Sequence, residues 1–428
     1  MMNRKTFLKL LTGSAAAISL NPLAARGQGD PAPARTGLAE PPDTSNWARI
    51  RDLFPLTRER VYFNTGGLGP PSGPVLDVLR EQTLDQAISG ETGHGLFHRA
   101  HRTAADYLGA EEEEVCFTRN ATEGNSIIAA GLDLRPDDEV IFESHAHPGG
   151  SFPWLVQQKE NGIKVRIFEP DPNSPEGNLD RIFSMVNERT RVIQVSHLTA
   201  PTGILFDVAG IAREARRRGI WFHIDGAQSA GMIPVDLHRI GCDSYATSGH
   251  KWMNGPQETG ILYIARERMA EVACSHAGAY SLSDYKLPDR MTYVPTTQRH
   301  EYGTRDAAPV AGLETAILLQ NRIGRERIAR HGKSLVDRTR STLREIDGLE
   351  ILTPDHPEMY NSIISFRLEG LVSDDIARML TGDYHLRCRN VTERGLNAIR
   401  ISWHVYNSED DLELLASAVR SIQKQSRS

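Results

Sequence analysis

The residues most able to take part in a reaction are an aspartate and a lysine, and each lies just after a predicted strand. Asp225 ends the segment His223-Ile224-Asp225, and Lys251 follows 26 residues later. A lysine in a dry cleft can lose its proton and attack a carbonyl carbon. A carboxylate facing it can hold the N–H of a heteroaromatic ring. This pair matches what pyridoxal 5′-phosphate (PLP) needs, which is a Schiff-base lysine and an acid on the pyridine nitrogen.

A second segment has the features of a phosphate site. Asn120-Ala121-Thr122 follows a predicted strand and opens an apolar helix. Free backbone N–H groups and the helix dipole at such a start bind phosphate, and the Thr122 hydroxyl adds a donor. The same residues also suit an ordinary helix N-cap. The phosphate interpretation therefore depends on the neighbouring Asp225 and Lys251.

Short β-rich runs alternate with helical patterns through the first three quarters of the chain. Such alternation predicts an α/β fold with a mostly parallel sheet covered on both faces, and ligands bind at the carboxyl ends of its strands. The seven predicted strands are Val115–Thr118, Glu139–Phe142, Lys164–Phe168, Arg191–Ser196, Trp221–Ile224, Ser244–Ala246 and Gly260–Ile264.

The pattern changes after residue 310. One long helix at about 310–345 is predicted, followed by a mixture of strands and helices with a final helix from Glu409. We therefore expect a large domain over 63–310 and a smaller α+β domain over 311–428. Residues 45–62 are expected to pack against the smaller domain.

The motifs HIDGAQ at 223–228 and SGHKW at 248–252 resemble those of the class V aminotransferase family. This family of fold type I PLP enzymes includes cysteine desulfurases, isopenicillin N epimerase-like proteins and C–S lyases. The resemblance implies that Lys251 carries PLP, that Asp225 binds its pyridine nitrogen, and that Gln228 lies near its phenolic oxygen. It also implies phosphate contacts from Ala121, Thr122, Ser248 and His250.

Three further site segments match the family pattern. The imidazole of His145 is expected to stack on the pyridine ring, with His147 as the alternative. Arg400 corresponds to the family arginine that binds the substrate α-carboxylate. The pair Gly303-Thr304 suits close approach to an anion, and in the family it comes from the partner subunit. The resemblance therefore implies a homodimer whose active sites contain residues of both subunits. Arg305 is expected to bind an acidic group on the substrate.

The match to desulfurases is incomplete. Ala200 stands where desulfurases have asparagine, and no cysteine falls in their nucleophile loop. The four cysteines are expected to be small buried hydrophobes. The epimerase-like branch is therefore nearer, and an aminotransferase-like or epimerase-like reaction is favoured over a C–S lyase or cysteine desulfurase. Transamination, elimination and epimerisation share their first step and stay open.

Two alternatives come from other classes of protein. One is a metallohydrolase, because an HxH pair together with further His or Asp residues is a recognised set of metal ligands. The other is a non-catalytic binding protein that kept the fold. The candidate metal ligands are His145, His147, His197, and His223 or Asp225.

Composition limits the partners. The 428 residues contain 49 Lys and Arg against 55 Asp and Glu, so no basic excess favours nucleic acid. No apolar run approaches the roughly 18 residues of a membrane helix, so stable membrane insertion is not expected. The expected partners are a small amino acid or peptide-like substrate and a second copy of the chain.

The first 27 residues predict an export signal. They hold Arg4, Lys5 and Lys9, then a short apolar stretch rich in alanine. The segment resembles a twin-arginine signal with lysine at the second arginine; an attached amphipathic helix is the alternative. Residues 28–44 predict a disordered linker. The chain also resembles an exported, periplasmic branch of the family that modifies the glutamyl group of the siderophore pyoverdine.

Overall fold

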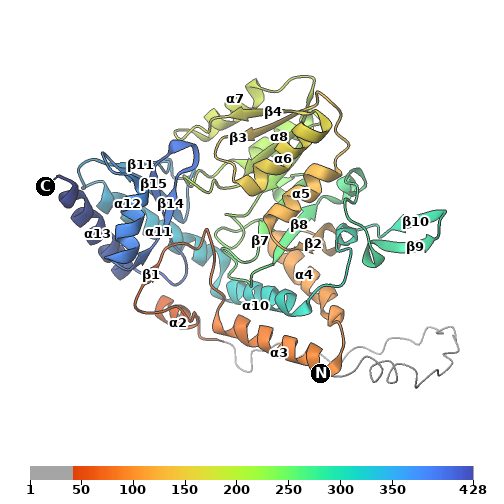
Figure 1. Cartoon of the computed structure of the whole chain (residues 1–428), viewed down its shortest axis with the longest axis horizontal. Coiled ribbons are helices and arrows are strands. Elements are labelled where there is room, and N and C mark those ends of the chain that lie inside the picture. The colour runs from red at the N-terminus through yellow and green to blue at the C-terminus, as the bar shows by residue number, and fades with distance from the viewer. Residues whose placement is uncertain (1–41, 428) are drawn as a thin grey trace, which may run out of the picture. The chain divides into compact units, whose positions relative to one another are not determined.

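The computed structural model describes residues 42–427 (Figure 1). The predicted export signal at 1–27 lies outside these residues, and so does most of the predicted linker at 28–44.

A seven-stranded sheet carries the candidate site. Its strand order is β2-β8-β7-β6-β5-β3-β4, and only β8 runs antiparallel to its neighbours. The predicted α/β class and all seven predicted strands are confirmed, each within two residues of its observed bounds. The strands are β2 (Val115–Thr118), β3 (Glu139–Glu143), β4 (Lys164–Phe168), β5 (Thr190–Ser196), β6 (Trp221–Asp225), β7 (Ser244–Ser248) and β8 (Gly260–Ile264).

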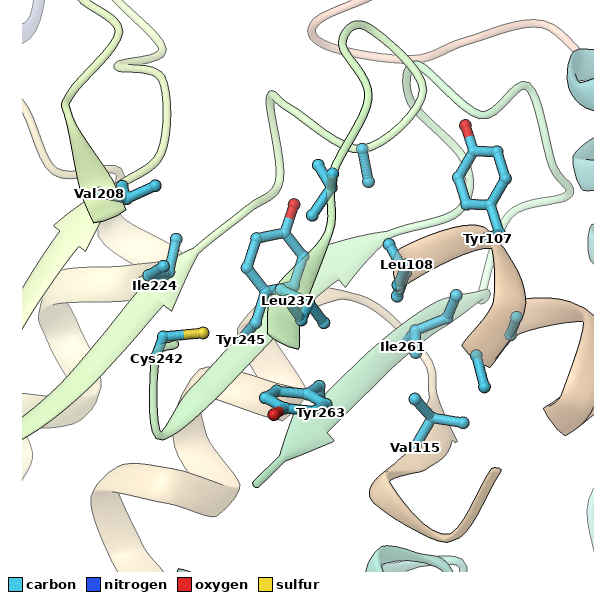
Figure 2. Close-up of a cluster of buried hydrophobic side chains, with 14 of the residues drawn as sticks. Tyr107, Leu108, Val115, Val208, Ile224, Leu237, Cys242, Tyr245, Ile261 and Tyr263 are labelled. Carbon is cyan, nitrogen blue, oxygen red and sulfur yellow. The ribbon is translucent and has the colours of Figure 1, made fainter. Parts of the chain in front are cut away.

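Both faces of this sheet are buried. Successive residues of β3 enter different apolar clusters, with Ile141 in one and Val140 and Phe142 in the other. This is the period-two alternation of a strand covered on both sides. Figure 2 shows part of the first cluster, in which Tyr245 on β7 and Tyr263 on β8 are cross-strand partners. The covering helices are α3 (Gly73–Ser89), α4 (Phe97–Leu108), α5 (Ala121–Gly131), α6 (Pro148–Asn161), α7 (Pro175–Ser184), α8 (Val208–Arg217), α9 (Leu237–Ile240) and α10 (Ala307–Ile323).

The C-terminal part contains a four-stranded antiparallel sheet with the order β11-β12-β15-β14. A third apolar cluster joins this sheet to three helices. The strands are β11 (Leu349–Ile351), β12 (Ile363–Leu368), β14 (Arg389–Val391) and β15 (Ala398–Ser402), and the helices are α11 (Arg325–Leu343), α12 (Ser373–Gly382) and α13 (Glu409–Arg427).

The single long helix predicted at 310–345 is wrong. The structure has two helices, α10 and α11, separated by Gly324. Gly324 has φ 97° and ψ 115°, a conformation that favours glycine and interrupts a helix. The expected domain boundary at 310/311 falls inside α10, where Val310 and Ala311 both pack in the first apolar cluster.

The start of the described chain lies against its C-terminal part. Helix α2 (Trp47–Asp52) buries Ile50, which packs in one cluster with Phe54, Val405 and Tyr406. Strand β1 (Val61–Tyr62) then pairs in parallel with β13 (Leu386–Arg387). These contacts fix the loop after β1, which reaches the candidate site.

A hairpin of β9 (Leu282–Lys286) and β10 (Arg290–Tyr293) was not predicted and projects from the sheet (Figure 1). Its tip exposes Leu287 and Tyr285. Across residues 42–427, no helix combines the length and apolar character needed to span a membrane.

Candidate active site

A cavity of about 320 Å³ lies at the carboxyl ends of β6 and β7. Parallel strands commonly place ligands at this edge of a sheet. The cavity joins residues that are far apart in the sequence, from the loop after β1 to β15. Its lining is Gly66, Gly67, Asn120, Ala121, Thr122, His147, Asp225, Ala227, Gln228, Ser248, His250, Lys251, Arg389 and Arg400.

Lys251 follows β7 and lines this cavity. Burial lowers the pKa of its amine to about 8. This pKa already includes the effect of the Asp225 carboxylate, which raises it, and the smaller effects of the Arg400 and Arg389 charges, which lower it. A lysine with this pKa is partly neutral near pH 8, which is the form that attacks a carbonyl or accepts a proton.

Asp225 ends β6 and is 5% exposed. Its Oδ1 accepts the backbone N–H of Ala227 at 3.0 Å, and its Oδ2 accepts the side-chain N–H of Asn125 at 3.2 Å. Hydrogen bonds donated to a carboxylate stabilise its charged form. Gly150 leaves room beside it, because a Cβ there would lie 2.7 Å from Oδ2.

The first turn of α5 forms one end of the cavity. Asn120 caps the helix, and the N–H of Ala121 is donated to Ser248 Oγ at 3.1 Å. Thr122 is exposed, and His250 Nδ1 is buried with no hydrogen-bond partner in residues 42–427. An oxyanion at this helix start would meet these donors, so the residues fit the phosphate of PLP.

Gln228 and Gly66 form a tight wall of the cavity. Gln228 Nε2 donates to the Gly66 carbonyl at 2.9 Å, and Trp252 Nε1 donates to Gln228 Oε1 at 2.8 Å. A Cβ at Gly66 would lie 2.8 Å from Gln228 Oε1 and 3.0 Å from Arg400 Nη2. A side chain at position 66 would therefore displace the ends of Gln228 and Arg400, the two groups that border the cavity here.

Arg400 enters the cavity from β15 and is fully buried. It donates to the Ala200 carbonyl and to Asn64 Oδ1, both at 3.0 Å, while its Nε has no partner in the described chain. Burial, followed by the charge of Arg389, lowers the pKa of Arg400 below its usual range. An incoming carboxylate would compensate this cation through a charge-assisted pair.

The structure places His147, rather than the favoured His145, in the cavity. His145 turns away to Thr202 Oγ1, 3.0 Å from its Nδ1, and to Glu169, 3.4 Å from its Nε2. His147 caps α6 by accepting the N–H of Gly149, which holds its ring at the cavity. The structure therefore favours the alternative, His147, as the histidine beside the cofactor, and which ring stacks on it stays a prediction.

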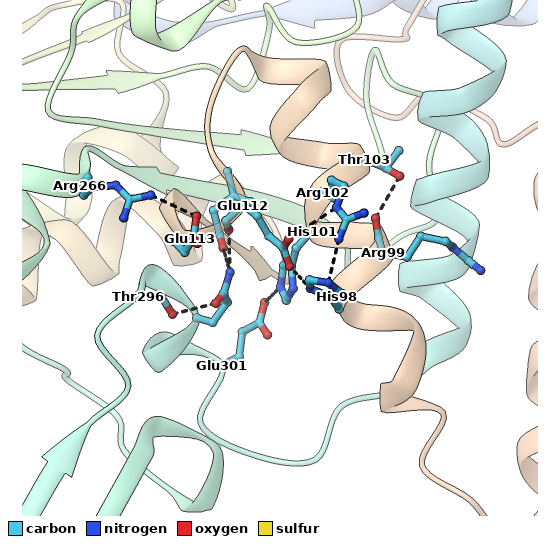
Figure 3. Close-up of polar contacts among 12 residues, drawn as sticks. His98, Arg99, His101, Arg102, Thr103, Glu112, Glu113, Arg266, Thr296 and Glu301 are labelled. Carbon is cyan, nitrogen blue, oxygen red and sulfur yellow. Dashed lines mark hydrogen bonds and ion pairs between the residues drawn. The ribbon is translucent and has the colours of Figure 1, made fainter. Parts of the chain in front are cut away.

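Gly303, Thr304 and Arg305 do not reach the cavity of their own chain. They line a separate cavity of about 300 Å³. Glu301 anchors this loop by accepting an N–H from His101 at 2.8 Å (Figure 3). It also accepts the backbone N–H of Phe117. The Arg305 guanidinium donates to the Phe117 carbonyl. The expected substrate contact of Arg305 stays a prediction.

Sequence reasoning missed three lining residues, Gly66, Gly67 and Arg389, and gave His147 only as the alternative to His145. The glycine pair in Asn64-Thr65-Gly66-Gly67 was a detectable signal for close backbone approach. Arg389 carried no such signal, because a lone arginine on a strand resembles a surface residue.

The fold and this cavity define a PLP-dependent enzyme of fold type I. Residues 89–415 match the family model Aminotransferase class-V. The chain therefore belongs to the class V aminotransferase family.

Named relatives fall into two groups. The chain is 30% identical to a probable cysteine desulfurase of Methanothermobacter thermautotrophicus, covering 87% of this chain and 97% of the relative. It is 28% identical to the isopenicillin N epimerase of Amycolatopsis lactamdurans, covering 88% of this chain and 99% of the relative. Both similarities span nearly whole chains.

Solved structures agree on the fold. The apo cysteine desulfurase of Thermococcus onnurineus NA1 matches with a TM-score of 0.81 and 26% identity, over 88% of this chain and 98% of that one. A mutant of the protein C-DES, with glycine covalently linked to its PLP cofactor, matches with a TM-score of 0.79 and 24% identity, over 86% and 98%. The second likeness supports the fold alone.

The metallohydrolase alternative finds no support in the geometry. Across the described part of the chain, no three His, Cys, Asp or Glu side chains are grouped to hold a metal ion. His223 is instead bonded to Asn125 and Ser244, and His197 is buried.

Proposed function

We propose that this enzyme removes the α-hydrogen of an amino acid, or of an amino-acid group in a larger metabolite, as an aminotransferase or epimerase. The observation that carries this proposal is that Lys251 and Arg400 share one cavity. The first supplies an amine with a lowered pKa, and the second supplies a cation for a carboxylate. These are the two groups that an α-amino acid requires.

Each residue has a distinct part. PLP, when bound, supplies an electron sink for the substrate's α-carbon. Arg400 binds and orients the carboxylate. Asp225 holds a proton on the ring nitrogen, and Lys251 takes up and returns the α-proton. Gly66 and Gln228 pack closely and limit water at this wall.

Arg389 is the basis for proposing a second anionic group on the substrate. It lines the same cavity and pairs with Glu393. Two arginines near one amine favour a substrate with a second anionic group. A glutamyl-bearing peptide metabolite, including a siderophore precursor, belongs to this class.

Sulfur chemistry is the second candidate, supported by the names of the desulfurase relatives. A persulfide mechanism needs a reactive thiolate. Cys388 is 1% exposed, and burial raises its pKa to about 12. None of the described residues that line the cavity is a cysteine. A C–S lyase needs no such thiolate, and its products distinguish it from an aminotransferase or an epimerase.

The test is hydrogen exchange in D₂O with the PLP-loaded enzyme. The substrates are L-glutamate, L-aspartate, L-alanine, L-cysteine, L-cystine and a glutamyl-containing siderophore peptide. Deuterium at the α-carbon of recovered amino acid supports the proposal when it is accompanied by a keto product, as for an aminotransferase, or by inverted configuration, as for an epimerase. Sulfide or persulfide as the sole product, without α-exchange of acidic substrates, favours the sulfur-releasing alternative.

Two further proposals complete this function. We propose that two copies share their active sites, because Thr304 and Tyr302 are exposed beside the anchored Glu301. We also propose that the enzyme works in the periplasm after export. Analytical ultracentrifugation and cell fractionation test the two proposals.

A further inference from the structure

A line of buried polar side chains ends on Asp225 and has no part in the chemistry described above. Trp221 and His223 belong to β6, Ser244 to β7 and Asn125 to α5. Trp221 Nε1 lies 2.9 Å from Ser244 Oγ, which lies 2.8 Å from His223 Nδ1. His223 Nε2 lies 2.8 Å from Asn125 Oδ1, and Asn125 Nδ2 lies 3.2 Å from Asp225 Oδ2. All five residues are at most 5% exposed.

The donor direction follows from the chemistry of each group. The indole N–H of Trp221 can only donate, so the Ser244 hydroxyl accepts it and donates its own hydrogen to His223 Nδ1. Asn125 Nδ2 faces two acceptors, the Gly149 carbonyl at 3.1 Å and Asp225. The amide oxygen of Asn125 therefore faces His223, whose Nε2 must carry the ring proton.

These donor directions leave one tautomer of His223 and one orientation of the Asn125 amide. Burial lowers the pKa of His223 to about 3, so the ring stays neutral with its proton on Nε2. A flipped Asn125 amide would place N–H against N–H at His223 and oxygen against the Asp225 carboxylate. Both contacts are repulsive in a buried site. His223 thereby prevents the Asn125 amide from rotating.

We propose that His223 and Asn125 are positioning residues that hold Asp225 charged and oriented toward the ring nitrogen of PLP. Every hydrogen bond along the line donates in one direction, and the last is donated to the carboxylate. The line stabilises a charge that burial disfavours. His223 acts through Asn125 and does not itself line the cavity.

The decisive measurement reads the ring nitrogen and does not depend on the proposed reaction. Wild type and variants are loaded with PLP carrying ¹⁵N in the pyridine ring, and the nitrogen chemical shift reports its protonation. Wild type is expected to show a protonated nitrogen. His223→Leu and Asn125→Ala are expected to lose that signal and to bind PLP about tenfold more weakly, since one hydrogen bond to a charged group is lost.

A matched control is available at His404. It is 2% exposed, and its Nε2 lies 2.7 Å from Asn254 Oδ1, but that asparagine donates to the Pro70 carbonyl rather than to a carboxylate. His404→Leu removes a comparable buried imidazole and is expected to keep the protonated ring nitrogen. An unchanged signal in His223→Leu would overturn the proposal, as would equal loss in His404→Leu.

Two measurements keep the proposal testable if His223→Leu does not fold. His223→Gln can donate an amide N–H to Asn125 Oδ1 and is expected to restore the protonated signal; failure of this rescue in a folded variant counts against the proposal. Neutron diffraction of the wild-type protein should place the His223 proton on Nε2. A proton on Nδ1 would contradict the donor direction.

Discussion

Arg389 on β14 and Arg400 on β15 are paired across the antiparallel strands, and both side chains line the cavity around Lys251. Two cations on one wall cost electrostatic energy unless anions meet them. Glu393 pairs with Arg389, whereas Arg400 Nε has no partner in residues 42–427. Arg400 Nε is therefore open to negative charge from a ligand, and a second anion on that ligand would share Arg389 with Glu393.

The first prediction concerns Arg389. Arg389→Gln should raise KM for a dicarboxylic amino acid about 10- to 100-fold with little change in kcat, since one charge-assisted contact is lost. KM for a monocarboxylic substrate should change much less. Arg387→Gln is the matched control, because Arg387 is exposed on β13. Equal effects of both variants, or on both substrates, would remove Arg389 from substrate recognition.

Lys251 should be the covalent attachment site and should titrate well below a free lysine. Borohydride reduction and peptide mapping should place the phosphopyridoxyl mass on Lys251. Only the neutral amine reacts, so PLP capture by the apoenzyme should accelerate with pH and level off above about 8, where the pKa of Lys251 lies. In Arg389→Gln the midpoint should move to higher pH, because a cation that lowers this pKa is gone. A wild-type midpoint near 10.5 would contradict the burial argument.

Asp225→Asn should still bind PLP, with affinity reduced at least as much as in His223→Leu, and should lower turnover by orders of magnitude. The amide preserves size but cannot hold the proton on the ring nitrogen. Asp243→Asn serves as control, because Asp243 is a partly buried carboxylate that accepts the Phe222 N–H and lies outside the cavity. Steady-state kinetics and bound-cofactor absorbance test both variants. Near wild-type turnover in Asp225→Asn would refute the assigned role.

Cysteine nucleophilicity should be dispensable. Cys388 is buried between β13 and β14, and burial also raises the pKa of Cys274. Cys388→Ala and Cys274→Ala should therefore retain activity on acidic amino acids, with at most a stability loss of about 1–2 kcal/mol for Cys388→Ala. Loss of activity in a folded variant, seen by circular dichroism, would return persulfide chemistry to first place.

The sheet was predictable because its central strands are buried on both faces and read as short apolar runs, whereas the partly exposed edge strand β4 was found from its β-rich composition. The first of these, Val115–Thr118, matches the observed β2 without change. Asp225 and Lys251 were located for a related reason, since the first ends such a run and the second follows one closely. Their roles rested on both residues together and on the family resemblance of HIDGAQ and SGHKW.

The remaining errors arose where tertiary contacts decide. His145 and His147 share one short segment, and only the cap that His147 makes on α6 selects which ring reaches the cavity. Arg389 gains its place from pairing with Arg400 across two strands, a relationship that no local spacing encodes. The helix break at Gly324 depends on a backbone conformation that glycine permits but does not require.

The last prediction concerns export, which rests on residues 1–27. A cofactor-loaded enzyme is poorly suited to crossing a membrane unfolded, because PLP would then have to be acquired outside the cytoplasm. We expect transport of the folded, PLP-loaded protein by the twin-arginine route. Arg4→Lys should leave an active, uncleaved enzyme in the cytoplasm, whereas Lys5→Arg should preserve or improve export by completing the arginine pair. Fractionation with absorbance of the bound cofactor measures both. Mature protein in the periplasm of a host that lacks this translocase would show that the route is wrong.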